Sequence, residues 1–186
     1  LSGATLKIQT GVTFAVVDGF DAGEMTAHDV AWSMNDANSK TNPASIHGQA
    51  GDFAGLWGEW TAVDDTTIEF EFNAYDSTWK DDYTNINGQA FSVLSKKAFE
   101  EKGEAWVADH LVATGPFVVE EWLRDESYTM VNRPGTHWDP ALEPKTERIQ
   151  FVQVSEPITR AALLRTGEVD LANLEPKDAA KFDLNE

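Results

Sequence analysis

The sequence of 186 residues has no cysteine, and this absence removes two classes of structure. A disulfide framework cannot form, and thiolates cannot hold a zinc ion. The redox compartment of the protein is therefore left open. The stability of the fold has to come from packing, hydrogen bonds and interactions between charges.

Basic residues are scarce: 14 lysines and arginines stand against 32 aspartates and glutamates, which gives a net charge of −18 and a pI near 4.4. Nucleic acids are disfavoured as partners because phosphate binding requires clusters of basic side chains. An anionic membrane surface is disfavoured for the same reason. The excess of carboxylates keeps a protein surface soluble, and it also suits a cationic ligand.

Long apolar runs are also missing, since no stretch approaches the ~20 apolar residues of a membrane span. The chain starts at Leu1 without a methionine, and neither the basic nor the apolar region of a signal peptide follows. We therefore expect a piece cut from a longer precursor.

Large apolar side chains are abundant. Hydrophobic residues make up 41% of the chain and aromatic residues 11%, which predicts an ordered core in spite of the charge. Tryptophan suits both cores and the walls of ligand clefts. The seven tryptophans are Trp32, Trp57, Trp60, Trp79, Trp106, Trp122 and Trp138.

The chain up to Gly103 predicts an α+β arrangement. Residues 5–17 are apolar or alternating and indicate a strand. Thr26 begins a helix over roughly 27–39, with an acidic side chain three positions later. Residues 39–58 are rich in Asn, Gly, Pro and Ser, and they predict a long loop that is functional or forms a partly ordered lid.

Two further elements are predicted in this part of the chain. The stretch WTAVDDTTIEFEFN indicates a hairpin that turns at Asp64 and Asp65, with Phe70 on its buried face. Ser95 is a suitable N-cap for a helix, and Gly103 ends or kinks that helix.

The C-terminal part predicts an α/β arrangement. Residues 117–122 and 127–133 indicate two strands, and RIQFVQV (148–154) carries apolar side chains on both faces, which is typical of a strand buried on both sides. Ser155 is expected to cap a helix that ends at Gly167, and VDLA then supplies another strand. Strand, helix and strand at this spacing predict a βαβ unit with a right-handed crossover.

Motifs for catalysis or metal binding are absent from the sequence. It has neither the Gly-x-Ser-x-Gly elbow of a serine nucleophile nor a glycine-rich phosphate loop. The four histidines are far apart without metal-ligand spacing, and we expect surface or helix-end roles for them. We therefore predict no enzymatic activity, no metal and no cofactor.

Paired carboxylates leave one enzymatic alternative open, a carbohydrate-processing domain. A glycosidase needs two carboxyl groups ~5–10 Å apart, one of them with a pKa raised by an apolar wall. Two carboxylates have tryptophan neighbours in the sequence that could provide such a wall. They are Glu59, between Trp57 and Trp60, and Asp139, next to Trp138. Solvated surface carboxylates are the competing interpretation, because 32 acidic residues produce neighbouring pairs by chance.

Two tryptophans receive different expectations. Trp122 lies in a predicted strand and is expected in the core. Trp57 lies in the long Gly-rich loop, where a ligand-facing role and a core role are equally reasonable.

Four stretches occur in a familiar order: VTF…DGFDAGEMTAHDVAWSM, VLSKKAFEEKG, ATGPFVVEEWLRDESYTMVNRPGTHWDP and RIQFVQVSEPITRAALLRTGEVDLA. Together they cover about half of the chain, and they resemble the periplasmic oligopeptide-binding proteins of ABC importers, the peptide/nickel class of extracellular solute-binding proteins. The chain departs from the family pattern at AVVDGFDAGEM, which is longer than the usual Asp-Gly turn, and at Ala113, where glycine is common.

The resemblance implies a fragment of a bilobed, periplasmic-binding-protein type II-like fold. Residues 1–103 would form a small inserted α+β domain and residues 104–186 part of the first α/β lobe, while the second lobe is absent from this chain. Thr114, Gly115 and Pro116 would form the turn at which the chain re-enters the first lobe, with Phe117 at an aromatic position that the family favours.

The resemblance also implies a receptor that captures a peptide-like or other small solute by lobe closure and delivers it to an ABC transporter. The expected partners are the solute, the permease subunits and the missing remainder of the chain, and the expected location is periplasmic or extracellular, with a lipid anchor as one arrangement in the full-length protein. Family members bind peptides, nickel chelates, haem or oligosaccharides, so the ligand stays open. The candidate ligand-side residues are Trp57, Asn87, Gln89 and Phe91 from the small domain and Thr114 and Trp138 from the first lobe.

A third hypothesis is a protein-interaction module. In that case the chain would bind through surfaces that the missing lobe normally covers, and its exposed apolar area would drive self-association.

Overall fold

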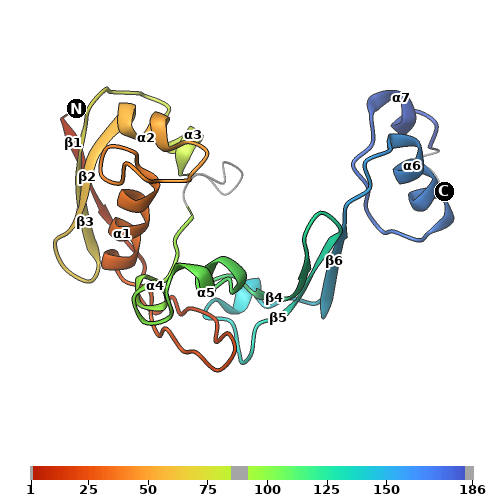
Figure 1. Cartoon of the computed structure of the whole chain (residues 1–186), viewed down its shortest axis with the longest axis horizontal. Coiled ribbons are helices and arrows are strands. Elements are labelled where there is room, and N and C mark those ends of the chain that lie inside the picture. Colours follow the sequence, from red (N-terminus) through yellow and green to blue (C-terminus); the bar gives the residue numbers. More distant parts are fainter. Residues whose placement is uncertain (1, 85–91, 183–186) are drawn as a thin grey trace. The chain divides into compact units, whose positions relative to one another are not determined.

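The computed structural model describes residues 2–84 and 92–182, and it divides the chain into two compact units (Figure 1). The first unit comprises residues 1–119 and 130–148, and the second comprises residues 120–129 and 149–186. The expected domain boundary after Gly103 lies inside the first unit. The assignment of the two parts to an inserted domain and a lobe stays a prediction.

A three-stranded antiparallel sheet in the first unit has the strand order β1-β3-β2. The strands are β1 (Gly3–Lys7), β2 (Trp57–Ala62) and β3 (Thr67–Phe72). Successive side chains of β3 point to opposite faces of the sheet: Ile68 and Phe70 lie on the buried face, and Glu69 lies on the exposed face. The predicted hairpin is thereby confirmed.

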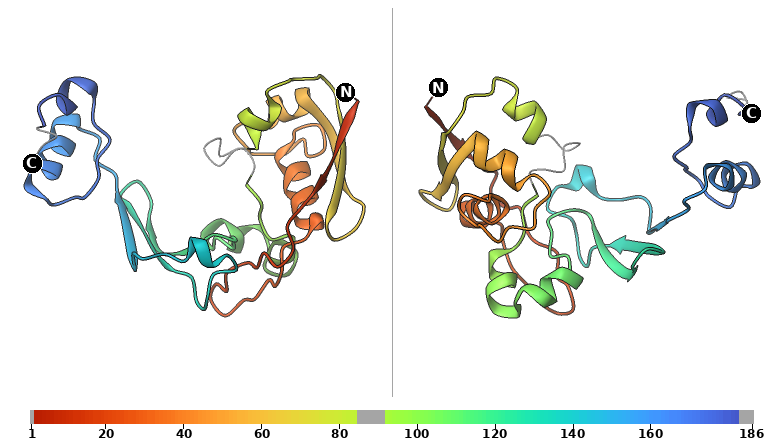
Figure 2. Two further views of the ribbon diagram at one scale, coloured as in Figure 1. Left: turned by 180° about the vertical axis from the view of Figure 1, so that it is seen from behind. Right: turned by 45° about the horizontal axis from the view of Figure 1, so that its top comes forward.

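Helix α1 (Ala27–Ala37) packs on the buried face of this sheet, and the views in Figure 2 show the two side by side. The helix begins with the predicted capping box. The Thr26 hydroxyl accepts a hydrogen bond from the His28 amide at 3.3 Å, and the Asp29 carboxylate accepts one from the Thr26 amide at 2.9 Å. The helix ends two residues before the predicted end.

The core between α1 and the sheet is mainly aromatic. Trp60 and Phe70 stack with ring centroids 4.1 Å apart, and Trp57 packs edge-on against both rings. Phe53 comes from helix α2 (Ala50–Leu56) and stacks on Trp57 at 5.0 Å. Trp79 comes from helix α3 (Trp79–Tyr83) and meets Phe70 edge-on.

Two predictions for the first unit need correction. The predicted loop over 39–58 contains α2, because burial of Phe53 and Leu56 outweighs the weak helix propensity of two glycines. The predicted strand over 5–17 ends at Lys7. Beyond it the backbone is irregular, and Phe14 is buried there without a continuous strand.

Helices α4 (Lys96–Lys102) and α5 (Glu104–Asp109) follow the residues outside the described part of the chain. The Ser95 hydroxyl accepts a hydrogen bond from the Ala98 amide at 3.1 Å, so the predicted N-cap is confirmed. Gly103 has φ 85° and ψ 164° and separates the two helices. That backbone conformation strongly favours glycine.

A second three-stranded sheet has the order β4-β5-β6. Its strands are β4 (Phe117–Leu123), β5 (Ser127–Asn132) and β6 (Arg148–Val152), and the short 3₁₀ helix η1 (Pro140–Leu142) lies between β5 and β6. Helices α6 (Pro157–Thr166) and α7 (Pro176–Ala179) complete the described chain. No helix in residues 2–84 or 92–182 is long and apolar enough to cross a membrane.

The C-terminal part departs from its predictions in several ways. β6 is largely exposed, and so is Trp122 on β4. The N-cap of α6 is Glu156 and not the predicted Ser155, and its side chain makes no capping hydrogen bond. The stretch VDLA forms no strand, so the predicted βαβ unit is not formed within the described residues. A strand is buried only where another layer packs on it, and α6 packs against α7. The predicted helix end at Gly167 is confirmed by its left-handed φ of 73°.

Candidate ligand-binding site

The turn before β4 lies at the centre of a hydrogen-bonded cluster, which we call the Thr114 cluster: Thr114, Arg133, His137, Trp138 and Glu143. The Thr114 carbonyl oxygen accepts hydrogen bonds from Trp138 Nε1 at 2.8 Å, from His137 Nε2 at 3.1 Å and from Arg133 Nη1 at 3.3 Å. These three donors fix the turn against the loop that follows β5.

Arg133 joins the turn to a segment far away in the sequence. Its guanidinium donates to the Thr13 carbonyl at 3.1 Å, to the Thr13 hydroxyl at 3.2 Å and to the Phe14 carbonyl at 2.9 Å. Only 7% of Arg133 is exposed, and its Nε has no partner among the described residues. Burial lowers the pKa of Arg133, and the negative charge of Glu143 opposes that effect.

His137 is a buried structural histidine in this cluster. Nε2 lies 3.1 Å from the Thr114 carbonyl oxygen and Nδ1 lies 2.9 Å from the Asp139 carbonyl oxygen, and each ring nitrogen donates to its carbonyl only when it carries a proton. Nδ1 lies 3.1 Å from the Asp139 amide nitrogen, and the His137 amide donates to Glu143 Oε2 at 3.0 Å. The surface or helix-end role expected for the histidines is wrong for this one.

Two of the predicted ligand-side residues, Thr114 and Trp138, meet in this cluster. Trp138 is half-buried, with its Nε1 committed to the backbone and its ring tilted against His137 at a centroid distance of 4.9 Å. Thr114 is half-buried, and its hydroxyl has no hydrogen-bond partner among the described residues. The cluster therefore combines an architectural carbonyl with a hydroxyl and an aromatic face.

The remaining predicted site residues are placed differently. Trp57 has no exposed surface, and its indole packs against Phe53, Trp60 and Tyr83, so it offers nothing to a ligand in this structure. The Gly-rich composition around it suggested a loop, but the residue starts a core strand. Asn87, Gln89 and Phe91 lie outside the described residues.

Sequence reasoning missed Arg133 and His137 as members of the cluster. The motif Asn-Arg-Pro-Gly reads as a polar turn after a strand, and nothing local indicates that its arginine is buried. The signal is the fold itself, which brings Thr13 to a residue 120 positions later.

The two carboxylates of the enzymatic alternative take part in different local structures. Asp139 Oδ1 accepts a hydrogen bond from the Ala141 amide at 2.9 Å and thereby caps η1. Glu59 is exposed on the outer face of the first sheet, beside the polar side chains of Glu69 and Lys40.

Residues 2–84 and 92–182 contain no group of three or more side chains that could hold a metal ion. Two histidines pair with exposed carboxylates instead: His28 lies 3.5 Å from Asp65, and His110 lies 3.1 Å from Asp18.

A hollow of about 520 Å³ lies between α1, α4, α5 and the loop before α2. Trp32 and Phe99 form one wall, with ring centroids 5.0 Å apart. The Asp36 and Glu104 carboxylates stand among its polar lining residues. Its size suits a small molecule, but Trp57, Thr114 and Trp138 are not among its lining residues.

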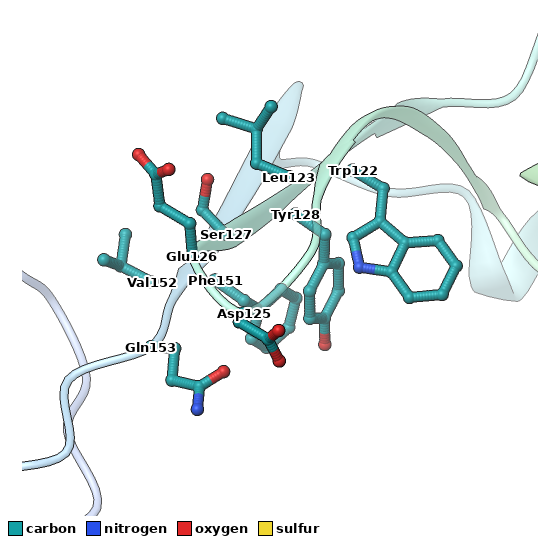
Figure 3. Close-up of a pocket in the computed structure, with 9 residues that line it drawn as sticks. All are labelled: Trp122, Leu123, Asp125, Glu126, Ser127, Tyr128, Phe151, Val152 and Gln153. Carbon is teal, nitrogen blue, oxygen red and sulfur yellow. The ribbon is translucent and has the colours of Figure 1, made fainter.

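The second sheet carries exposed aromatic side chains beside a smaller hollow of about 180 Å³ (Figure 3). Tyr128 and Phe151 stack with ring centroids 4.5 Å apart and an interplanar angle of 14°. Trp122 lines the same hollow, and the Arg124 guanidinium lies 4.6 Å from its ring centroid. Apolar rings exposed in this way are unusual on a chain with so much charge.

Comparison with known proteins adds a family assignment to this geometry. Residues 3–186 match the family model described as "Bacterial extracellular solute-binding proteins, family 5 Middle". Among curated proteins, the glutathione-binding protein GsiB of Shigella flexneri is 27% identical over 177 residues. That match covers 95% of this chain but 31% of the relative, so the chain spans about a third of the length of such relatives.

Solved structures show the same fold. HbpA2 from Haemophilus parasuis matches 97% of this chain and 37% of its own, with a TM-score of 0.79 and 20% identity. DppA from Helicobacter pylori, in complex with peptide STSA, matches 90% of this chain and 34% of its own, with a TM-score of 0.71 and 23% identity. NikZ from Campylobacter jejuni, in complex with Ni(L-His), has a TM-score of 0.76 and 16% identity over the whole chain. The predicted fold class, part of a periplasmic-binding-protein type II-like fold with α+β and α/β portions, is confirmed.

Proposed function

Because this chain belongs to the bacterial extracellular solute-binding proteins of family 5, we propose that it is part of a receptor that captures a peptide-like or other small solute and delivers it to an ABC transporter. The observation that carries this proposal is the family match, which extends over residues 3–186. The permease subunits of the transporter are the expected protein partners. The location would be periplasmic or extracellular.

The names of the relatives narrow the class of solute. They mention glutathione, a tetrapeptide and a nickel–histidine complex, which are all built from amino acids. A solute of this kind has an ammonium group, a carboxylate and a polar backbone, and a net charge of −18 favours the cationic members of that class. We propose a short peptide, or a metal complex of an amino acid, as the solute.

In this proposal the chain performs no catalysis. Binding would occur by closure of two lobes around the solute, and a closed lobe interface needs polar groups that orient the solute and apolar walls that exclude water. Thr114 and Trp138 are the described residues that we assign to the solute side. Asn87, Gln89 and Phe91 remain assigned to it from the sequence alone.

The test uses the full-length protein with a panel of dipeptides, tripeptides, glutathione and nickel–histidine. Thermal unfolding and solution scattering should show stabilisation and compaction with at least one of these solutes. If no solute raises the unfolding temperature and none compacts the protein, the receptor proposal fails.

Matched variants test the assignment of Thr114 once a solute is found. Thr114→Val removes the hydroxyl and keeps the carbonyl that anchors the cluster, so the affinity should fall roughly tenfold, as expected for one lost hydrogen bond in a desolvated site. Thr5→Val changes an exposed threonine on β1 and should leave the affinity unchanged. If Thr114→Val alters stability but not affinity, the residue is architectural only.

A further inference from the structure

The hollow between α1, α4, α5 and the loop before α2 lies within the first unit and is large enough for a ligand of its own. Helix α1 packs against α4, and α4 packs against α5 (Figure 1). The volume of about 520 Å³ falls in the range of small-molecule sites, roughly 300–1,000 Å³. The described lining residues include no member of the Thr114 cluster, so this hollow is separate from the candidate solute site.

Aromatic and aliphatic side chains form the apolar part of the lining. Trp32 on α1 and Phe99 on α4 are in ring contact, and Val107 on α5 extends this wall. Both rings are half-buried, so part of each remains accessible. Ile46, from the loop before α2, also lines the hollow, yet 95% of it is exposed. A bound apolar group would remove such surface from water, which is favourable.

Two neutral polar side chains of the lining are already paired within the protein. The Ser33 hydroxyl donates a hydrogen bond to the Leu94 carbonyl at 3.3 Å and accepts one from the Leu94 amide at 3.0 Å. The Asn42 side-chain nitrogen donates to Asp36 Oδ1 at 3.0 Å, and its oxygen accepts from the Ala44 amide at 3.1 Å. These groups therefore hold the wall together and have little bonding capacity left for a ligand.

The carboxylates of Asp36 and Glu104 are the charged groups of the lining, and its described residues include no lysine or arginine. Asp36 is half-buried, and Asn42 uses only one of its two oxygens. Glu104 is exposed at the start of α5, and no described side chain forms an ion pair with it. An anionic ligand would meet two like charges here, whereas a cation would find acceptors beside an apolar wall.

We propose that this hollow binds a small organic cation with an aromatic or aliphatic body, at a site distinct from the Thr114 cluster. The ammonium or guanidinium group of the ligand lies against Asp36 and Glu104, and its apolar body packs against Trp32 and Phe99. A charge over the Trp32 ring gains a cation–π attraction in addition. The net charge of −18 attracts cations to the surface around the site. Because the described lining belongs to the first unit alone, binding does not require lobe closure.

Isothermal titration calorimetry of the full-length protein tests the charge preference with phenethylamine, which is a cation at neutral pH. The neutral 2-phenylethanol is its control, because it has the same ring and chain with a hydroxyl in place of the ammonium. Phenethylamine should bind with a Kd below about 1 mM, and 2-phenylethanol about tenfold more weakly, because charge-assisted hydrogen bonds are lost. Equal affinities, or no saturable binding of phenethylamine, would overturn the proposal.

Variants of the lining locate the site. Asp36→Asn keeps an acceptor oxygen for Asn42 and removes the charge, so the affinity for phenethylamine should fall roughly tenfold. Glu104→Gln changes an exposed carboxylate and should lower the affinity about threefold. Glu101→Gln removes the same charge from α4 outside the lining and should have no effect. If Asp36→Asn and Glu104→Gln behave like Glu101→Gln, the hollow is not the site.

Urea unfolding shows whether each variant is folded, and the exposed Glu104→Gln keeps the test valid if Asp36→Asn is not. Trp32→Leu removes the aromatic wall and should weaken binding of phenethylamine about fivefold. An unchanged affinity in folded Trp32→Leu would contradict the proposed position of the ring.

Thr114→Val separates this site from the candidate solute site. It should leave the affinity for phenethylamine unchanged, whereas a loss of affinity in Thr114→Val but not in Asp36→Asn would place the probe at the solute site and overturn the proposal. Binding of phenethylamine that depends on Asp36, in a protein that binds no peptide or metal complex, would support this site while the receptor proposal fails.

Discussion

Replacement of Arg133 by methionine tests whether the Thr114 cluster stabilises the first unit. The side chain makes four hydrogen bonds, and among the described residues it supplies the only donors to the carbonyl oxygens of Thr13 and Phe14. Methionine keeps the length and apolar packing of the stem and removes every donor. The Thr114 carbonyl retains Trp138 and His137 as donors, so it is not orphaned.

The magnitude follows from the two orphaned acceptors. Each buried carbonyl left without a donor costs about 1–3 kcal/mol. Removal of a buried cation without a carboxylate partner at contact distance returns part of that loss, because the charge no longer has to be desolvated. We therefore expect Arg133→Met to lower the free energy of unfolding by about 2–4 kcal/mol.

Urea unfolding followed by tryptophan fluorescence measures this change. Arg148→Met removes the same charge at an exposed position on β6 and should change stability by less than about 1 kcal/mol. Arg133→Lys keeps the charge but not the planar set of donors, so it should fall between the parent and Arg133→Met. If Arg133→Met matches the exposed control, the desolvation penalty of the guanidinium cancels its hydrogen bonds, and our account of the cluster is wrong.

Three further predictions follow from single contacts. Trp138→Phe removes the donor to the Thr114 carbonyl and keeps most of the ring, so urea denaturation should show a loss of about 1 kcal/mol, and an unchanged midpoint would contradict that bond. Hydrogen bonds from the backbone and side chain of Thr78 lower the pKa of Asp76 below its ordinary value of 3.8. The stability that the Asp76 carboxylate contributes to the fold is therefore present above pH 3.8 and is lost as pH falls through the lowered pKa. Asp76→Asn should therefore weaken the loss of stability as pH falls below 3.8, followed by circular dichroism, whereas an unaltered acid limb would refute the assignment. Gly103→Ala places a side chain at φ 85°, and thermal unfolding should show a loss of stability of about 1–3 kcal/mol. Gly115 has no positive φ, so Gly115→Ala should cost less, and equal losses for the two variants would contradict the strain argument.

Local patterns predicted the elements whose signals are local. The capping box at Thr26, the N-cap at Ser95 and the alternation around Phe70 each depend on residues within a few positions, and each is confirmed. The ordered set of four motifs predicted the family and the fold for the same reason, since it needs only the sequence.

The patterns failed where the deciding partner is distant. Helix α2 forms because Phe53 reaches an aromatic core contributed by later strands, and its own glycines obscure it. Arg133 looks like a surface arginine because its acceptors lie about 120 positions earlier. The apolar pattern of β6 predicts burial correctly only if a covering layer is present, and the described residues do not provide one. Of the Thr114 cluster, the sequence singled out Thr114 and Trp138, and their role toward a solute stays a prediction.

The path of the chain through the first unit has a consequence for the order of folding during synthesis. Residues 120–129 interrupt that unit and belong to the second one, so the first unit is completed only by residues 130–148. Thr13 and Phe14 emerge early from the ribosome but have to wait for Arg133 before their carbonyls are paired. Closing so long a loop is entropically slow. The N-terminal half therefore leaves the ribosome as an incomplete intermediate, and a synonymous codon change that slows translation before residue 133 should prolong its exposure to chaperones and proteases.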